Sequence, residues 1–366
     1  MAQPGVYISY PFCAQKCSFC NFASGVFPRS LEVEYFIALR AEIEAFRWKE
    51  CPDTVYLGGG TPSQMEGCAL VDLLGTIPGR SWREATMEAA PGTLNAENVA
   101  AWCSAGINRV SLGVQSFNAA ELSRTGRKHD AAIVAGDCAL LRSSGIENIN
   151  VDLIAGMPGQ TLRSWNESLD WIERLAPPHV SVYLFEVDED SRLGFEILQG
   201  GGRYGAAAVP TDDVMAEMYG VALERLAAMG IQRYEISNFA RPGMESHHNL
   251  KYWLLHPYVG FGADAHSFDG ERRSSNVETA QEYVDCAKAG KAPQCETGIA
   301  NLEQERFFVG LRLLHGIEPR AEEWVRFAEP IERFVKNGLL EREGAFLRLT
   351  GQGVLLSNEV FQEFVN

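Results

Sequence analysis

The stretch that decides the fold is Cys13-Ala14-Gln15-Lys16-Cys17-Ser18-Phe19-Cys20, which spaces three cysteines as C-x3-C-x2-C within eight residues. Thiolates are soft ligands that favour iron–sulfur clusters and zinc over hard cations. A [4Fe-4S] cluster normally takes four cysteines, and the next cysteine is the distant Cys51. Three thiolates leave one iron open to a small chelating ligand. A zinc site would need a fourth ligand close by, and residues 21–23 read Asn-Phe-Ala. We therefore interpret Cys13, Cys17 and Cys20 as cluster ligands.

The charge and length of the chain limit what it can bind. Its 366 residues suffice for one large domain and a small one, and a hydrophobic fraction of 46% is ordinary for a globular protein. The formal net charge is −16. Nucleic-acid binding rests mostly on Lys and Arg side chains that neutralise phosphates. An acidic chain without a basic tract is therefore not expected to act on DNA or RNA.

The N-terminal segment and the cysteines indicate a compartment. Residues 1–4 carry no basic segment, so we expect no signal peptide. No apolar run reaches the roughly 18 residues that span a bilayer. The nine cysteines are an odd number without an evident disulfide framework, which is typical of a reducing cytosol. We therefore expect a cytoplasmic protein.

Apolar strand-like runs alternate with helical stretches over the first 240 residues. The strand candidates are residues 6–9, 55–58, 85–89, 109–113, 149–154 and 181–187, and the helical stretches include residues 31–46 and 131–143. Repeated strand–helix units predict a parallel sheet with helices outside. Six units indicate an open, partial TIM-like β/α barrel rather than a closed one. Sites in such folds form on loops after the strands, and the cysteine loop follows the first candidate.

The pattern changes in the last third of the chain. Residues 200–210 are interpreted as a solvated surface loop, followed by a helix at 212–229 and a further strand at 232–237. Helices at 303–314 and 330–337 precede a hairpin around Glu343-Gly344. This order predicts a small α+β module of winged-helix type. Because the module is acidic, we expect a structural or interaction role rather than DNA binding. We expect three parts: residues 1–240, a connecting segment 241–297, and the module at 298–366.

A glycine-rich turn, Gly58-Gly59-Gly60-Thr61-Pro62, follows the second strand candidate. Consecutive glycines let a backbone approach a ligand closely and expose its amides. Such a turn alone is often only a tight connection. Beside the cysteine motif it indicates a binding site.

The cysteine spacing and the glycine turn resemble the radical S-adenosylmethionine (SAM) superfamily. The resemblance implies that the open iron chelates the amino and carboxylate groups of SAM and that a cluster electron cleaves its sulfonium. It also implies that Gly59, Gly60 and Thr61 hold the methionine amino group.

Further residues resemble the group that contains oxygen-independent coproporphyrinogen III oxidase. They occur in order along the chain, in segments such as E-A-A-P-G-T at 88–93 and V-D-L-I-A-G-M-P-G-Q-T at 151–161. The resemblance implies contacts to SAM from Tyr7, Phe19, Glu88, Gln115, Arg127 and Asp152. The chemistry is consistent, because carboxylates accept from ribose hydroxyls and a guanidinium pairs with a carboxylate.

Three features separate this chain from the oxidases within that group. The oxidases carry a fourth cysteine where this chain has Phe22, and tens of residues precede their cysteines where this chain has twelve. The segment His248-Asn249-Leu250-Lys251-Tyr252-Trp253 matches the H-N-x-x-Y-W motif of the HemW subgroup of haem chaperones. The chain therefore resembles HemW-like proteins.

The H-N-x-x-Y-W segment supplies the haem hypothesis. Histidine is a good axial ligand for haem iron, and aromatic faces pack against a porphyrin. We expect His248 to contact haem, with His247 and His266 as rivals. The alternative is a structural histidine.

The resemblance implies three bound groups: a [4Fe-4S] cluster, SAM and haem. It implies a haem chaperone that delivers haem to an unidentified acceptor protein and draws on an electron donor. A peripheral membrane contact through the acceptor and a homodimer stay open. The alternatives are a coproporphyrinogen III oxidase or another radical SAM enzyme such as a methyltransferase, so whether the chain is an enzyme is also open.

Overall fold

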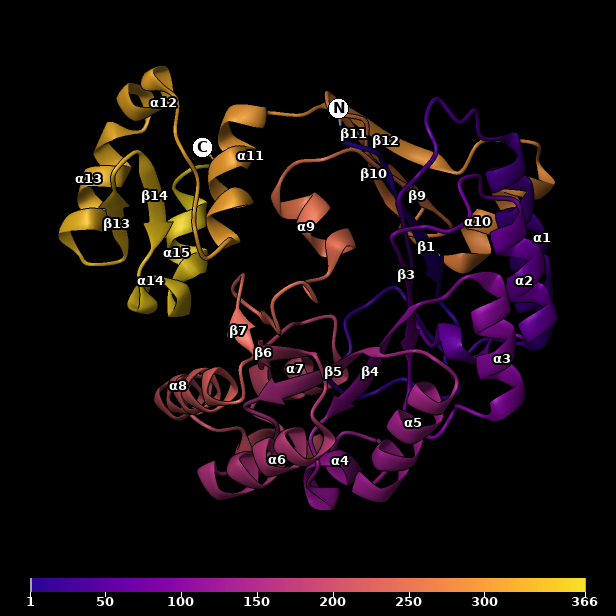
Figure 1. Cartoon of the computed structure of the whole chain (residues 1–366), viewed down its shortest axis with the longest axis horizontal. Coiled ribbons are helices and arrows are strands. Elements are labelled where there is room, and N and C mark those ends of the chain that lie inside the picture. Colours follow the sequence, from indigo (N-terminus) through magenta and orange to yellow (C-terminus); the bar gives the residue numbers. More distant parts are fainter. Residues whose placement is uncertain (1, 366) are drawn as a thin grey trace.

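The six expected strands pair in parallel and in chain order in the computed structural model, which describes residues 2–365 (Figure 1). They are β1 (Gly5–Tyr10), β2 (Thr54–Gly59), β3 (Glu84–Ala89), β4 (Arg109–Gln115), β5 (Asn148–Ala155) and β6 (His179–Leu184). The sheet is open, because its two edge strands, β12 and β7, do not pair with each other. The predicted partial barrel is thus confirmed.

Helices cover the outer face of this curved sheet (Figure 1). They are α1 (Arg29–Ala45), α2 (Gly67–Gly75), α3 (Ala96–Ala105), α4 (Ala119–Arg124), α5 (Ala131–Ser143), α6 (Leu162–Leu175) and α8 (Asp212–Ala228). Three short helical segments, η1 (Pro62–Gln64), α7 (Arg192–Leu198) and η2 (Arg203–Ala208), lie instead in the connections that follow β2 and β6. Local capping fixes several starts: the Asp130 side chain accepts from the Ile133 amide, and Thr161 forms a capping box with Ser164. No helix in the described part of the chain has the length and apolarity needed to cross a membrane.

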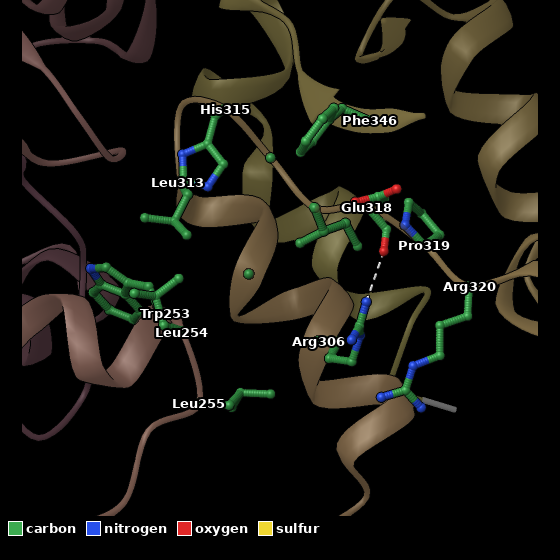
Figure 2. A pocket seen from close by; sticks show the side chains of 13 residues that line it. Trp253, Leu254, Leu255, Arg306, Leu313, His315, Glu318, Pro319, Arg320 and Phe346 are labelled. Atoms are coloured by element: carbon green, nitrogen blue, oxygen red, sulfur yellow. Dashed lines mark hydrogen bonds between the residues drawn. The ribbon is translucent and has the colours of Figure 1, made fainter. Parts of the chain in front are cut away.

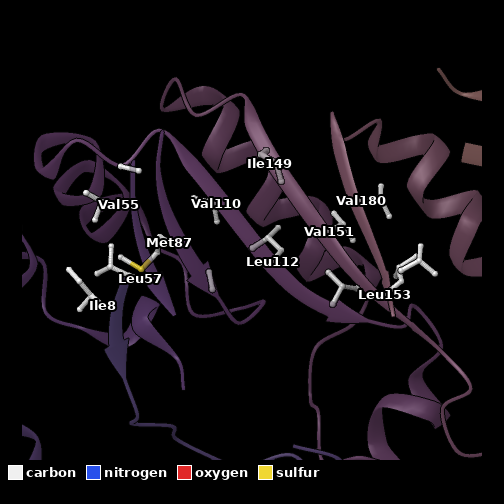
Figure 3. Close-up of a cluster of buried hydrophobic side chains, with 14 of the residues drawn as sticks. Ile8, Val55, Leu57, Met87, Val110, Leu112, Ile149, Val151, Leu153 and Val180 are labelled. Atoms are coloured by element: carbon white, nitrogen blue, oxygen red, sulfur yellow. The ribbon is translucent and has the colours of Figure 1, made fainter. Parts of the chain in front are cut away.

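The outer face of the sheet carries the core. Alternate strand residues such as Val55, Leu57, Val110 and Leu112 are fully buried against the helices (Figure 3). The residues between them face the hollow of the barrel, and most of these are polar. Burial of the apolar set contributes about 25 cal/mol per Å², which fixes the register of each strand and points the polar set inward.

The sheet continues beyond residue 240, where a connecting segment was expected. Residues 241–297 supply α9 (His247–Trp253), β9 (Tyr258–Phe261), β10 (His266–Phe268), β11 (Arg272–Asn276) and α10 (Ala280–Lys288), and β12 (Gln294–Ile299) follows. β9 pairs with β1 in parallel, and β10, β11 and β12 extend the sheet antiparallel. Of the strand expected at 232–237, only β7 (Gln232–Arg233) forms, and the separate strand β8 (Asn238–Ala240) follows and pairs with it antiparallel.

The segment at residues 200–210 is packed rather than freely solvated. Ala206 is buried in a small apolar cluster with Met157 and Phe185, and the Gly159 amide donates to the Ala208 carbonyl at 2.7 Å. The 3-10 turn η2 therefore covers the end of β5, and the prediction of a solvated loop at residues 200–210 was wrong.

The last elements lie apart from the sheet, on the far side of α9 (Figure 1). They are α11 (Leu302–Phe308), η3 (Gly310–Arg312), α12 (Ala321–Arg326), α13 (Ala328–Lys336), β13 (Leu340–Glu343), β14 (Phe346–Leu349), α14 (Gly351–Leu355) and α15 (Ser357–Gln362). The hairpin and the helix at 330–337 are as predicted. The helix expected at 303–314 ends at Phe308, because the chain tightens into η3 where Gly310 packs on Ile317.

Candidate functional site

Backbone hydrogen bonds to three other segments hold the cysteine loop in place. The Cys13 amide donates to the Gly25 carbonyl at 2.8 Å, and the Ser18 amide donates to the Thr125 carbonyl at 3.2 Å. From α7, the Leu193 amide donates to the Ser18 carbonyl at 2.8 Å. The loop is thus held at the carboxyl end of the strands, as expected from its position after β1.

The three candidate cluster ligands, Cys13, Cys17 and Cys20, are partly exposed free thiols on this loop. Burial raises the pKa of the Cys13 thiol, although hydrogen bonds from Thr61 and Ser24 lower it. In residues 2–365 no three His, Cys, Asp or Glu side chains gather closely enough to hold one metal ion. Thiolates of a cluster bind separate irons, so they need not converge on one point.

The glycine turn lies directly against the start of the cysteine loop. The Gly60 amide donates to the Tyr10 carbonyl at 2.8 Å, and the Thr61 amide donates to the Phe12 carbonyl at 2.9 Å. A Cβ at position 60 would lie 2.6 Å from the Phe12 carbonyl oxygen, and Gly59 has φ +106°. Glycine is therefore required here for packing, and the turn brings Gly59, Gly60 and Thr61 beside Cys13.

Two carboxylates expected at the site face the hollow of the barrel. The Tyr56 hydroxyl donates to Glu88 Oε1 at 2.8 Å, and burial raises the pKa of Glu88 to about 7. Asp152 accepts from Asn150 Nδ2 at 2.7 Å and from Ser111 Oγ at 3.1 Å, and burial raises its pKa as well. Both residues are half-buried, and their carboxyl groups lie within a network of polar side chains.

Gln115 and Arg127 have polar atoms that other described residues leave unpaired. Gln115 Oε1 and Arg127 Nε are buried and have no hydrogen-bond partner within residues 2–365. Gln115 also adopts φ +69°, which is uncommon for a residue with a side chain. Such strain and unmet hydrogen bonding are often found at ligand sites. These two unpaired polar atoms, an acceptor on Gln115 and a donor on Arg127, therefore fit a polar ligand.

Aromatic side chains border the same space. The Arg127 guanidinium carbon lies 5.9 Å from the centre of the Phe19 ring, and the rings of Tyr7 and Tyr56 stack at 6.1 Å. The structure thus brings the candidate residues on β1 to β5 together with the two loops. The remaining candidate, His248, is elsewhere.

His248 lies at the amino end of the strands and is 1% exposed. Its Nδ1 is hydrogen-bonded with Thr54 Oγ1 at 2.9 Å, and its Nε2 with the Tyr252 hydroxyl at 2.8 Å. Burial lowers the pKa of His248 to about 3, so the ring is neutral. Both ring nitrogens are thus engaged with protein hydroxyls in this structure, and the haem contact expected of His248 stays a prediction. Of its rivals, His247 is half-buried and His266 is exposed.

The helix that carries His248 closes the amino end of the barrel (Figure 1). The buried Glu84 carboxylate accepts from the backbone amides of His247 and His248, both at 2.9 Å, and from the Ser246 hydroxyl at 3.2 Å. Lys251 Nζ pairs with Asp53 at 2.6 Å. α9 is therefore locked to β2 and β3 at the end opposite the cysteine loop.

Sequence reasoning missed four residues that face the hollow of the barrel. They are Tyr56, Arg109, Asn150 and His179, and Arg109 and His179 are fully or almost fully buried. His179 Nδ1 is hydrogen-bonded with Asn150 Oδ1 at 2.6 Å. The signal was the alternation within β2 to β6, where a polar residue occupies nearly every second position. Period-two polarity in a parallel strand marks a hollow that is not filled by core.

Known proteins resemble the chain over most of its length. The model of the Radical SAM superfamily matches residues 7–172. The chain is 35% identical to the protein named Heme chaperone HemW of Bacillus subtilis, over 98% of both. It is 34% identical to the HemW of Mycobacterium tuberculosis H37Rv, over 97% of this chain and 93% of that one. The solved Escherichia coli coproporphyrinogen III oxidase (HemN) is similar in fold, with a TM-score of 0.84 over 99% of this chain and 90% of its own, at 20% identity.

Proposed function

The chain belongs to the HemW haem chaperone family within the radical SAM superfamily, and from this we propose that it binds haem and delivers it to an acceptor protein. The observation that carries the proposal is the similarity to HemW proteins along the whole chain, including the segments after residue 240. We further propose that it carries a SAM-ligated [4Fe-4S] cluster. Its nine unpaired cysteines favour a cytoplasmic location.

The cluster is assigned to Cys13, Cys17 and Cys20, and the unpaired polar atoms beside them fit a SAM site. The backbone of Gly59, Gly60 and Thr61 would receive the methionine amino group. When bound, the cluster and SAM together supply one-electron chemistry at the sulfonium. The protein's part is to hold three thiolates on a loop fixed from three sides.

The remaining SAM contacts are assigned to side chains around the hollow. The two carboxylates, Glu88 and Asp152, would accept from ribose hydroxyls. Arg127 keeps a free Nε after its Nη1 donates to the Gly113 carbonyl at 2.6 Å, so it can pair with the SAM carboxylate. Gln115, Tyr7 and Phe19 would complete the pocket.

The decisive experiment compares haem binding with porphyrinogen turnover. The full chain is reconstituted with iron and sulfide under anaerobic conditions and divided between two assays. Titration with haem should give a Soret band with saturable binding, and mixing the loaded protein with an apo-haem protein should transfer the band. Incubation with coproporphyrinogen III, dithionite and SAM should leave the porphyrinogen unchanged. Formation of protoporphyrinogen would instead identify a coproporphyrinogen oxidase.

A further inference from the structure

A cavity of about 510 Å³ opens between the C-terminal end of α9 and the last elements of the chain (Figure 2). Its volume is within the range of about 300–1,000 Å³ that is typical of cofactor sites. Seven lining residues are apolar: Trp253, Leu254, Leu255, Leu313, Ile317, Pro319 and Phe346. The cavity lies beside the amino-end helix α9 and is therefore separate from the cysteine loop.

The polar lining residues are few and of particular kinds. They are one histidine, His315, two arginines, Arg306 and Arg320, and one carboxylate, Glu318. Figure 2 shows His315 and Phe346 toward one end of the cavity and the two arginines toward the other. Two cations against one anion make the charged lining net positive, in a chain whose formal net charge is −16. The cavity thus combines an apolar body, an imidazole and a cationic edge.

We propose that this cavity is the haem site, with the His315 imidazole as iron ligand and Arg320 as a partner of the propionates. The proposal rests on the haem-chaperone function proposed above and specifies where that haem binds. Haem is a flat apolar ring with an iron at its centre and two carboxylates on one edge. Imidazole is a common ligand of haem iron, guanidinium pairs with carboxylate, and aromatic faces pack against rings.

His315 is displayed on a turn that is held from both sides. The Leu314 amide donates to the Tyr234 carbonyl at 3.0 Å, and the Ile317 amide donates to the Leu347 carbonyl at 2.9 Å. Gly316 has φ +70°, and a Cβ there would lie 2.1 Å from the Leu347 carbonyl oxygen. The His315 side chain itself is exposed and has no hydrogen bond or ion pair with another residue in the described range 2–365. A rigid turn therefore presents a free imidazole.

The arginine edge is also preorganised. Arg306 Nη2 donates to the Glu318 carbonyl oxygen at 2.8 Å (Figure 2), and Arg306 Nε lies 3.2 Å from Glu323 Oε1. Arg306 therefore shapes the wall, while the exposed Arg320 can reach a ligand. Leu254 and Phe346 are 44% and 42% exposed, which is a large apolar exposure for two residues of one cavity. Haem binding would remove this surface from water.

The two ends of the H-N-x-x-Y-W segment then have different roles. His248 fixes α9 to the barrel, and Trp253, at the other end of the same helix, lines the cavity. The Arg312 guanidinium carbon lies 4.4 Å from the Trp253 ring centre and holds the indole in place. The segment contributes an aromatic wall rather than the iron ligand.

The test is an anaerobic haem titration of the cluster-reconstituted full chain and three variants. His315→Ala should shift the Soret band and weaken binding by about tenfold or more, because one ligand bond is lost. Added imidazole should restore the original band. Arg320→Glu should weaken binding by a few-fold to tenfold without moving the band, and the matched Arg241→Glu at an exposed site should change neither.

The outcomes separate the site from the function. If the parent chain binds haem and both His315→Ala and Arg320→Glu bind it with unchanged band and affinity, the site assignment is wrong and the chaperone function stands. A Soret band that shifts in His266→Ala and not in His315→Ala would also overturn the assignment of the haem site. If the parent chain itself binds no haem, the proposed function and the site fail together. His315 is exposed, so unchanged thermal unfolding serves as the folding control.

Discussion

Replacing His248 by alanine should destabilise the protein without moving the haem spectrum. The substitution leaves the Thr54 and Tyr252 hydroxyls without their partner, in a region where Thr54 is fully buried. A buried polar group without a partner costs about 1–3 kcal/mol. We expect the free energy of unfolding to fall by about 3 kcal/mol at pH 7.

The same substitution should change how stability depends on pH. Burial holds the pKa of His248 at about 3 in the folded protein, whereas an unfolded histidine titrates near 6.5. Below about pH 6.5 the His248 imidazole is protonated in the unfolded chain and stays neutral in the folded chain. Acid therefore favours unfolding of the parent chain. By linkage this costs the parent about 2 kcal/mol between pH 7 and pH 5. The alanine variant has no imidazole at this position and does not lose this stability. The difference in the free energy of unfolding between the parent chain and His248→Ala should therefore fall from about 3 kcal/mol at pH 7 to about 1 kcal/mol at pH 5.

The assay is urea unfolding under argon, followed by tryptophan fluorescence at pH 7 and pH 5. Thr54→Val is the matched control, because it removes one of the two hydrogen bonds and keeps the titrating imidazole. Its deficit should be similar at both pH values. A deficit of His248→Ala that stays constant between pH 7 and pH 5 would refute the neutral, structural histidine. A shifted Soret band in a folded variant would return His248 to the haem site.

Three further outcomes test the carboxyl and amino ends of the barrel. Cys17→Ala should abolish the broad iron–sulfur absorbance after reconstitution and Cys103→Ala should not; an intact cluster in the former would contradict the ligand assignment. Asp152→Asn should weaken SAM binding about ten- to a hundred-fold while the cluster assembles, and calorimetry showing equal affinity would make the residue structural. Glu84→Ala should cost about 2–3 kcal/mol and speed amide exchange in α9, unlike Glu97→Ala on the exposed start of α3.

Local signals allowed part of the molecule to be predicted. The cysteine spacing and the glycine turn are confined to short segments, and the six strand–helix units repeat within neighbouring residues. The strands after residue 240 gave no such signal. β11 reads Arg-Arg-Ser-Ser-Asn and has no apolar run. Every residue of β12 is exposed, because β12 is the edge strand of the sheet and buries little. Their pairing with β9 and β10 depends on contacts that form only when distant segments meet.

The role of His248 could not be read from the sequence for a related reason. A histidine in a short motif is compatible with a ligand and with a buried hydrogen-bonding group, and only its surroundings decide. Here the surroundings come from Thr54, almost two hundred residues earlier in the chain, and from Tyr252 one helical turn later. His315 shows the converse, since it belongs to no recognised motif and becomes notable only through the cavity around it.

The strand β3 connects the two ends of the barrel in a way that bears on how SAM and haem could influence each other. Glu84, at its start, caps α9, whose far end lines the proposed haem cavity; Glu88, four residues later, faces the proposed SAM site. Residues four apart on one strand share a face, so both carboxylates belong to the same polar hollow. A regular strand paired on both sides transmits little displacement, because its register is fixed by buried neighbours such as Met87. We therefore expect the two ligands to bind largely independently, with any coupling carried by charge across the hollow rather than by movement of α9.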